Sequence, residues 1–135
     1  MAATLSNEGW GRRIALWGLM AFYGVAGVAH LLATDAMVRI VPPFVPFAHA
    51  VVIATGMLEL AGVIGLATPR WRRTAGWAFA TYALCVWPAN IRHAMLDLSS
   101  GTGLPLAYHA PRLLLQPLII WWALWASGAV GRRQP

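Results

Sequence analysis

Glu59 is the residue where chemistry in this chain is best sought, because it is a carboxylate in the middle of a long apolar stretch. Residues 47–68 read FAHAVVIATGMLELAGVIGLAT, which is about the length that a helix needs to cross a bilayer. A charged side chain at the bilayer centre costs roughly 2.5–3.5 kcal/mol on insertion scales. We therefore expect Glu59 to face protein rather than lipid, and to have a polar partner there.

Each of the other long apolar stretches also contains polar side chains, and together they could form a site around Glu59. His30 ends the first stretch, and Arg112 and Gln116 open the last. In a compact bundle these groups converge on one polar pocket in the outer half of the membrane. The predicted site has Glu59 and His30 as candidate catalytic residues, and Tyr82, Asn90, His93, Arg112 and Gln116 as candidate ligand-binding residues.

Each of these polar residues also has a simpler interpretation. His30, His93 and Arg112 lie near the ends of apolar stretches, where long polar side chains often reach the headgroups. Hydrogen bonds between helices alone would account for Glu59, Asn90 and Gln116. His49 and His109 are expected at the membrane interface. Only the joint placement of the polar residues favours a site.

The composition indicates a membrane protein. The chain has 135 residues, of which 59% are hydrophobic and 10% charged, and its mean hydropathy is +0.62, which is too apolar for a soluble domain of this size. All ten basic residues are arginines that punctuate apolar runs, so no nucleic-acid partner is expected. Cys85 is the only cysteine, which excludes an internal disulfide, and we expect it to be buried as a small apolar residue.

The apolar stretches predict an all-α membrane bundle of four helices in up-down-up-down order. The predicted spans are residues 14–33, 47–68, 74–95 and 112–130, with tails at 1–13 and 131–135 and a loop at 96–111. Residues 1–11 are expected to be disordered or to lie on the surface. Pro88 is expected to kink the third span. Glycines such as Gly24, Gly27 and Gly56 are expected at close helix contacts.

The arginines also predict the orientation of the chain. One side of this topology has Arg12, Arg13, Arg70, Arg72, Arg73, Arg132 and Arg133, and the other has Arg39, Arg92 and Arg112. By the positive-inside rule, both termini then lie in the cytoplasm. The arginines thus predict the orientation of a multi-pass membrane protein.

Five motifs in order resemble the DoxX family of small bacterial membrane proteins. They are GVAHLL, IVPPFVP, TGMLELAGVIGLATPRWRRTAGWA, VWPANI and RLLLQPLIIWWA, and the resemblance extends from about Gly24 to Trp122. It implies four membrane helices, a multi-pass location in the bacterial cytoplasmic (inner) membrane, and an association with quinone-coupled oxidation or redox maturation. A fold-level resemblance of this kind supports the architecture more than the activity.

Two hypotheses for the function stay open at this level, and whether the protein is an enzyme is uncertain. In the first, it is a redox-associated membrane component that binds a quinone or another lipid-soluble molecule, with Glu59 as proton carrier. Its electrons would come from a partner membrane or redox protein, because no haem, metal or flavin motif is evident. His30 and His93 with Glu59 could in principle ligate a haem or a metal. In the second, it is a non-enzymatic accessory subunit or assembly factor, in contact with membrane lipid and with other chains, including further copies of itself.

Overall fold

The computed structural model describes residues 2–131, with side chains from residue 9 onward. These residues form helices and no strand, so the all-α prediction is confirmed. In chain order the helices are α1 (Ala2–Leu32), α2 (Thr34–Val38), α3 (Ala48–Ala67), α4 (Arg72–Ser100), α5 (Leu106–Leu114) and α6 (Gln116–Ala126). Arg132 and Arg133, and most of the predicted C-terminal tail, lie outside the described residues.

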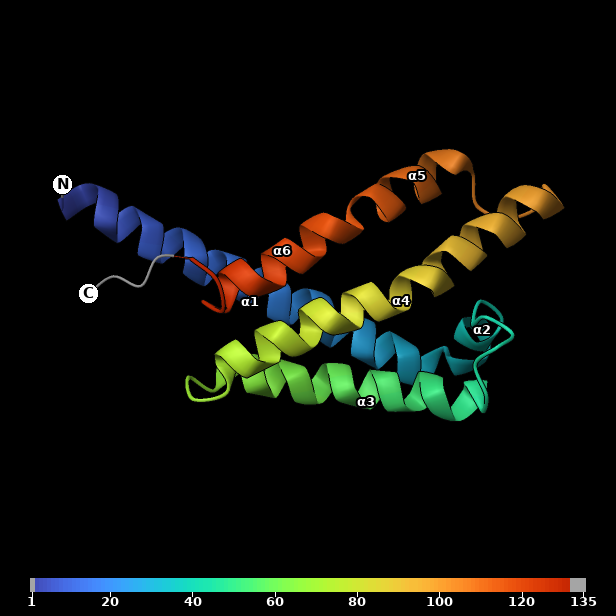
Figure 1. The fold of residues 1–135 in the computed structure, drawn as a ribbon, viewed down its shortest axis with the longest axis horizontal. Helices are drawn as coiled ribbons and strands as arrows, with labels where there is room; N and C mark the ends of the chain where they lie inside the picture. The colour runs from blue at the N-terminus through green and yellow to red at the C-terminus, as the bar shows by residue number, and fades with distance from the viewer. Residues whose placement is uncertain (1, 132–135) are drawn as a thin grey trace.

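The long helices run back and forth along one axis (Figure 1). α1 packs against α3 and α6, and α4 packs against the same two helices, so the four make a closed ring of contacts. The start of α1, the α3–α4 turn and the end of α6 lie at one end of the molecule, while α2 and the α4–α5 connection lie at the other. We call these the terminal end and the α2 end.

Two of the helices could cross a membrane by length and apolar composition: α1 from Gly9 to Leu32, and α3. Of the other two predicted spans, α4 includes several charged side chains, and the last is divided between α5 and α6. A membrane bundle of four spans therefore stays a prediction.

Several helix boundaries differ from the predicted ones. The polar N-terminal tail was expected to be disordered or surface-lying, but α1 already begins at Ala2; residues 2–8 contain no proline, and each residue added to an existing helix gains a backbone hydrogen bond. The predicted loop 96–111 is shorter, because α4 continues through Pro88 to Ser100 and α5 starts at Leu106. Gly101 then ends α4 in the left-handed conformation, at φ 67°.

The predicted last span is interrupted at Leu115, between α5 and α6. Pro117 follows directly, and since proline has no backbone N–H, it cannot donate the helical bond to the carbonyl of residue 113. The interruption leaves Arg112 on α5 and Gln116 as the first residue of α6.

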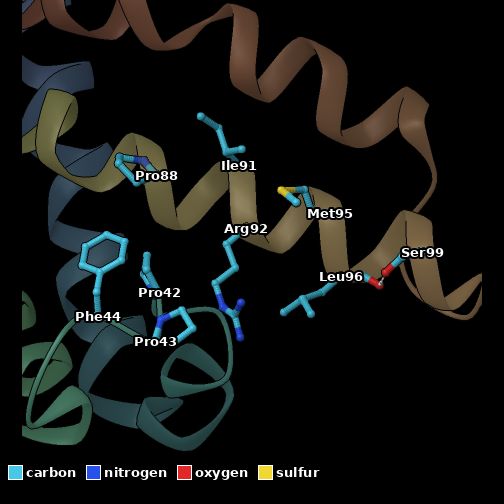
Figure 2. A pocket seen from close by; sticks show the side chains of 9 residues that line it. All are labelled: Pro42, Pro43, Phe44, Pro88, Ile91, Arg92, Met95, Leu96 and Ser99. Atoms are coloured by element: carbon cyan, nitrogen blue, oxygen red, sulfur yellow. Dashed lines mark hydrogen bonds between the residues drawn. The ribbon is translucent and has the colours of Figure 1, made fainter.

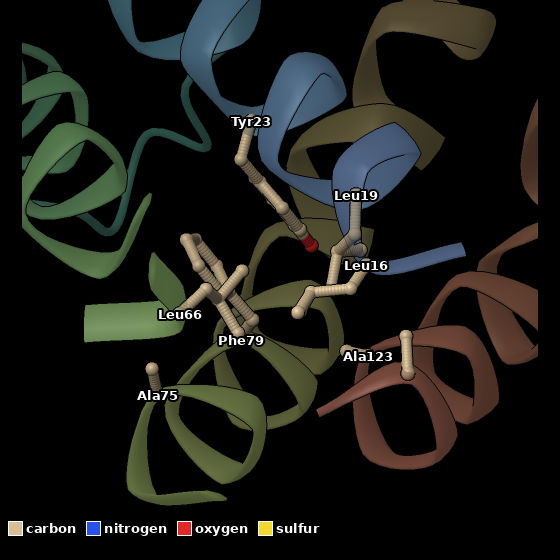
Figure 3. Close-up of a cluster of buried hydrophobic side chains, with 8 residues drawn as sticks. Leu16, Leu19, Tyr23, Leu66, Ala75, Phe79 and Ala123 are labelled. Carbon is tan, nitrogen blue, oxygen red and sulfur yellow. The ribbon is translucent and has the colours of Figure 1, made fainter. Parts of the chain in front are cut away.

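The apolar core lies toward the terminal end, and all four long helical segments contribute to it. Its buried side chains include Leu19 and Tyr23 of α1, Leu66 of α3, Phe79 of α4 and Ala123 of α6 (Figure 3). The rings of Tyr23 and Phe79 stack with their centroids 3.9 Å apart. Cys85, in contrast to the prediction, is exposed and takes no part in this core.

The contact between α1 and α3 depends on two glycines. A Cβ atom on Gly56 would lie 2.9 Å from the Cβ of His30 and 3.0 Å from the carbonyl oxygen of Gly27. A Cβ on Gly27 would meet the carbonyl oxygen of Gly56 at 3.0 Å. Gly24 was also expected at a close contact, but a Cβ atom added to it would have no neighbour within 4 Å among the described residues.

We predict that Gly56→Ala lowers the melting temperature of the detergent-solubilised protein, because the added methyl group forces α1 and α3 apart. Overpacking of this kind costs about 1–3 kcal/mol. Gly24→Ala is the matched control on α1 and should leave the melting temperature unchanged or raise it slightly, since alanine favours the helix. Equal effects of the two substitutions would show that the Gly27–Gly56 contact does not hold these helices together.

Candidate functional site

Glu59 is buried on α3, with 2% of its surface exposed, as the sequence predicted for a mid-helix carboxylate. Its Oε2 atom lies 3.0 Å from Nδ1 of His30 on α1. The same Nδ1 lies 2.8 Å from the carbonyl oxygen of Ala26. A single Nδ1 proton aimed at Ala26 does not also point at Glu59, so Oε2 touches the imidazole and yet lacks a well-aligned hydrogen bond.

Tyr82 of α4 also interacts with Glu59, and with Thr55 one turn earlier on α3. His30, Glu59 and Tyr82 therefore form one group where α1, α3 and α4 meet. We call it the Glu59 group. It brings together the two candidate catalytic residues and one of the candidate ligand-binding residues.

The other four predicted site residues form a separate chain of contacts that begins at Arg112 of α5. The two terminal nitrogens of Arg112 reach His93 Nδ1 at 2.9 Å and Asn90 Oδ1 at 2.7 Å, both on α4. Asn90 donates in turn to Gln116 Oε1 at 3.4 Å, and Gln116 donates to the carbonyl oxygen of Ala83. We call these residues, with the two that follow, the Arg112 network.

Asp97 and His109 complete the Arg112 network, and neither was a predicted site residue. Asp97 Oδ2 accepts from the Leu104 amide at 3.1 Å and contacts Nε2 of His109 at 3.0 Å and Nε2 of His93 at 3.2 Å. His109 was expected at the membrane interface but is fully buried, at 0% exposure. The i, i+4 spacing of His93 and Asp97 was the available signal, and it was missed because residues 96–111 were taken for a loop.

The proton positions in this network follow from Arg112, which can only donate. His93 Nδ1 must accept from it, which places the His93 proton on Nε2, facing Asp97. The Leu104 amide donates to the same carboxylate, and Nε2 of His109 lies against it. The network is thus a carboxylate held by three donors.

His93, Asp97 and His109 are also the described residues closest to a metal-binding arrangement, since their ligand atoms all lie within 4.8 Å of one another. A metal needs an unprotonated imidazole nitrogen. While Arg112 bonds to Nδ1 of His93, the neutral ring presents a proton at Nε2 instead of a lone pair. The geometry favours a hydrogen-bonded joint between α4 and α5 over a metal centre.

The predicted site residues thus lie in two groups. Among the described residues, no hydrogen bond or ion pair joins the Glu59 group to the Arg112 network. Most hydrogen bonds of the Arg112 network are made within it, and the buried Nδ1 of His109 has no partner among the described residues. That the two groups form one ligand pocket stays a prediction.

A groove on another face of α4 was not predicted. It has a volume of about 440 Å³ and lies between the segment that follows α2 and the second half of α4. Its lining consists of Pro42, Pro43, Phe44, Pro88, Ile91, Arg92, Met95, Leu96 and Ser99. Figure 2 shows the Arg92 side chain reaching from α4 toward Pro42 and Pro43. The sequence signal was a stripe at helical spacing from Pro88 to Ser99, opposite the prolines that follow α2.

Comparison with protein families identifies a match. A family model described as "Domain of unknown function (DUF8561)" matches residues 19–127. No curated protein and no solved structure matches the chain.

The predicted membership of the DoxX family is wrong, because the matching family model is a different one and covers all five motifs. Those motifs consist largely of glycines, small apolar residues and prolines. Closely packed membrane helices and their turns require such residues in any family, so they did not identify this one.

We predict that Asp97→Asn loosens α5 from α4 and lowers the melting temperature at pH 7 by a few degrees. Asparagine keeps the shape of the side chain but removes the negative charge that accepts from the Leu104 amide and contacts the two imidazoles. Melting curves of wild type and Asp97→Asn at pH 7 measure the difference.

The control for this prediction is Asp35→Asn. Asp35 is exposed and lies 3.5 Å from His49, so its contribution should be small at every pH. If Asp97→Asn melts like the wild type at pH 7, the Arg112 network does not hold α5 in place.

Proposed function

We propose that this chain, which belongs to the family described as "Domain of unknown function (DUF8561)", is a multi-pass membrane protein that binds a lipid-soluble small molecule. The observation that carries the proposal is the groove on α4, a hollow with mostly apolar walls in a protein whose outer surface is itself apolar.

The distribution of side chains supports a membrane location. Large apolar side chains point outward, such as Trp17 and Ile64, which are 69% and 68% exposed, whereas the polar Glu59, His109 and Gln116 are buried. A protein folded in water hides its apolar side chains and leaves such polar groups outside. The opposite arrangement suits a hydrocarbon surrounding, in which polar groups must find partners inside the protein.

The Arg112 network supports α4 and the α5–α6 unit as the two remaining spans. The polar residues that lower the hydropathy of α4, including Asn90, His93 and Asp97, are paired with residues of α5 and α6 or of the short connection before α5. Paired in this way, they need not meet lipid. The proposed bundle is therefore α1, α3, α4 and α5–α6, with both termini in the cytoplasm of a bacterial cell.

The groove has the properties of a small-molecule site. Its volume of about 440 Å³ lies within the range of roughly 300–1,000 Å³ that is usual for ligand pockets, and apolar walls with a few polar groups are typical of them. The walls of proline, phenylalanine, isoleucine, methionine and leucine suit a quinone or another lipid-soluble molecule. The proposal concerns binding; the predicted redox association and the accessory-subunit alternative stay predictions.

We predict that Leu96→Trp reduces the amount of lipid-soluble ligand that co-purifies in mild detergent by at least half, because the indole ring fills part of the groove. The measurement is mass spectrometry of organic extracts, normalised to protein. Leu98→Trp is the matched control: Leu98 is an exposed residue of the same helix that does not line the groove, so this variant should retain the ligand.

Glu59→Gln tests whether the ligand binds in the groove or at the Glu59 group. Glu59 does not line the groove, so its substitution should leave retention unchanged. Ligand lost from Glu59→Gln but kept by Leu96→Trp would place the site at the Glu59 group and contradict the proposal. Stoichiometric protein partners with no extractable ligand would instead favour the accessory subunit.

The proposed topology predicts opposite locations for two reporters. A fusion after residue 135 should report the cytoplasm, and an insertion between residues 99 and 103 should report the outside, because five arginines of the described residues gather at the terminal end: Arg12, Arg13, Arg70, Arg72 and Arg73. Alkaline phosphatase and a fluorescent protein serve as complementary reporters. If both sites report the same side, α5–α6 does not cross the membrane between them, and the proposed fourth span is wrong.

A further inference from the structure

We infer that the groove on α4 holds an acidic phospholipid, with the headgroup on Arg92 and an acyl chain along the apolar walls. The inference rests on the proposed function and names its ligand. Three observations carry it: the state of Arg92, the order of polar and apolar side chains along the groove, and the direction of the groove in the proposed bundle.

Arg92 has a buried donor without an acceptor. Its Nε atom is shielded from solvent and has no hydrogen-bond partner among the described residues. Arg112, by contrast, contacts His93 and Asn90, and Arg72 donates from Nε to the carbonyl oxygen of Leu66 at 2.8 Å. A buried donor of this kind calls for an acceptor from outside the described residues, and since a guanidinium group stays charged in proteins, an anion suits it best.

The lining of the groove suits an amphiphilic ligand, because its apolar and polar residues lie in different parts. Arg92 is the only charged residue of the lining, and Ser99 is the only one with a side-chain hydroxyl. Figure 2 shows Phe44 near Pro88 at one end of the groove and Ser99 at the other, with Arg92 between them. Along α4, Pro88 and Ser99 are about 16 Å apart at 1.5 Å per residue. One end of the groove is therefore apolar, and the charged and hydroxyl groups lie from its middle to the other end.

The direction of the groove fits a lipid of the outer leaflet. In the proposed topology the α2 end faces outward, so Ser99 lies near the outer surface and Pro88 lies deeper in the hydrocarbon. A phospholipid in that leaflet has its headgroup near the surface and its chains pointing inward, which is the order of the groove. Arginine matches phosphate oxygens with two parallel donors, and a neutral quinone would leave its charge unpaired.

The test compares two phospholipids that have the same acyl chains and differ in net charge: phosphatidylglycerol and phosphatidylcholine. Each is titrated onto the delipidated full chain in detergent, and bound lipid is measured by native mass spectrometry. We expect wild type to bind phosphatidylglycerol about tenfold more tightly. Arg92→Gln should remove the preference, and Arg92→Lys should keep part of it because the positive charge remains.

Arg39→Gln is the matched control for surface charge. Arg39 is exposed and close to the same end of the molecule but does not line the groove, so the preference should persist in this variant. High salt should weaken phosphatidylglycerol binding to wild type and leave phosphatidylcholine binding unchanged. If Arg92→Gln does not purify in folded form, Arg92→Lys and the salt series decide the question.

The outcomes separate the inference from the proposed function. If wild type binds both lipids equally, and Leu96→Trp weakens both, the groove binds lipid-soluble molecules without selecting charge, and only the inference fails. A charge preference that Arg39→Gln removes and Arg92→Gln preserves also overturns the inference. If Leu96→Trp changes the binding of neither lipid and of no extracted ligand, the groove is not a binding site and both ideas fail.

Discussion

The pairing of polar side chains inside an apolar protein is the constraint on which the rest of this structure depends. Glu59 is buried against His30 and Tyr82, and the α4–α5 contact centres on a carboxylate that accepts an amide and contacts two imidazoles. In an apolar protein interior, an unpaired group of this kind is costly. The helices can therefore come together only in arrangements that bring these partners into contact.

Helix α4 serves three purposes because its faces differ. Near the terminal end, Phe79 belongs to the apolar core with Tyr23 and Leu66. In the second half, the face with Asn90, His93 and Asp97 is bonded to α5 and α6 or to the connection before α5, and another face lines the groove. The hydrogen-bonded face attaches α4 to α5 and α6. The groove face includes Arg92, whose buried Nε has no hydrogen-bond partner among the described residues.

The burial of Glu59 and the positions of most helices could be predicted from the sequence, whereas the candidate site residues could be predicted only in part. Glu59 stands in a continuous apolar run, and that alone predicts burial with a partner. Asp97 and His109 were missed because glycine, serine and proline near residues 99–105 suggested a longer loop, although Gly101 only ends α4. The groove was missed because its two walls, the segment after α2 and the second half of α4, are distant in sequence. Short packing motifs also suggested the wrong family, since glycine and proline patterns report helix contacts rather than ancestry.

The sequence by itself determined the helices, the burial of Glu59 and the apolar character of the outer surface, because these depend on hydropathy and local backbone preference, which are read within one segment. Only the tertiary structure decided which polar residues meet. Whether Arg112 pairs with His93 or with Glu59, and whether Arg92 is paired at all, depends on the rotation of each helix about its axis and on the break at Leu115. Those rotations follow from close contacts such as Gly27 with Gly56, which arise only when segments distant in sequence pack together.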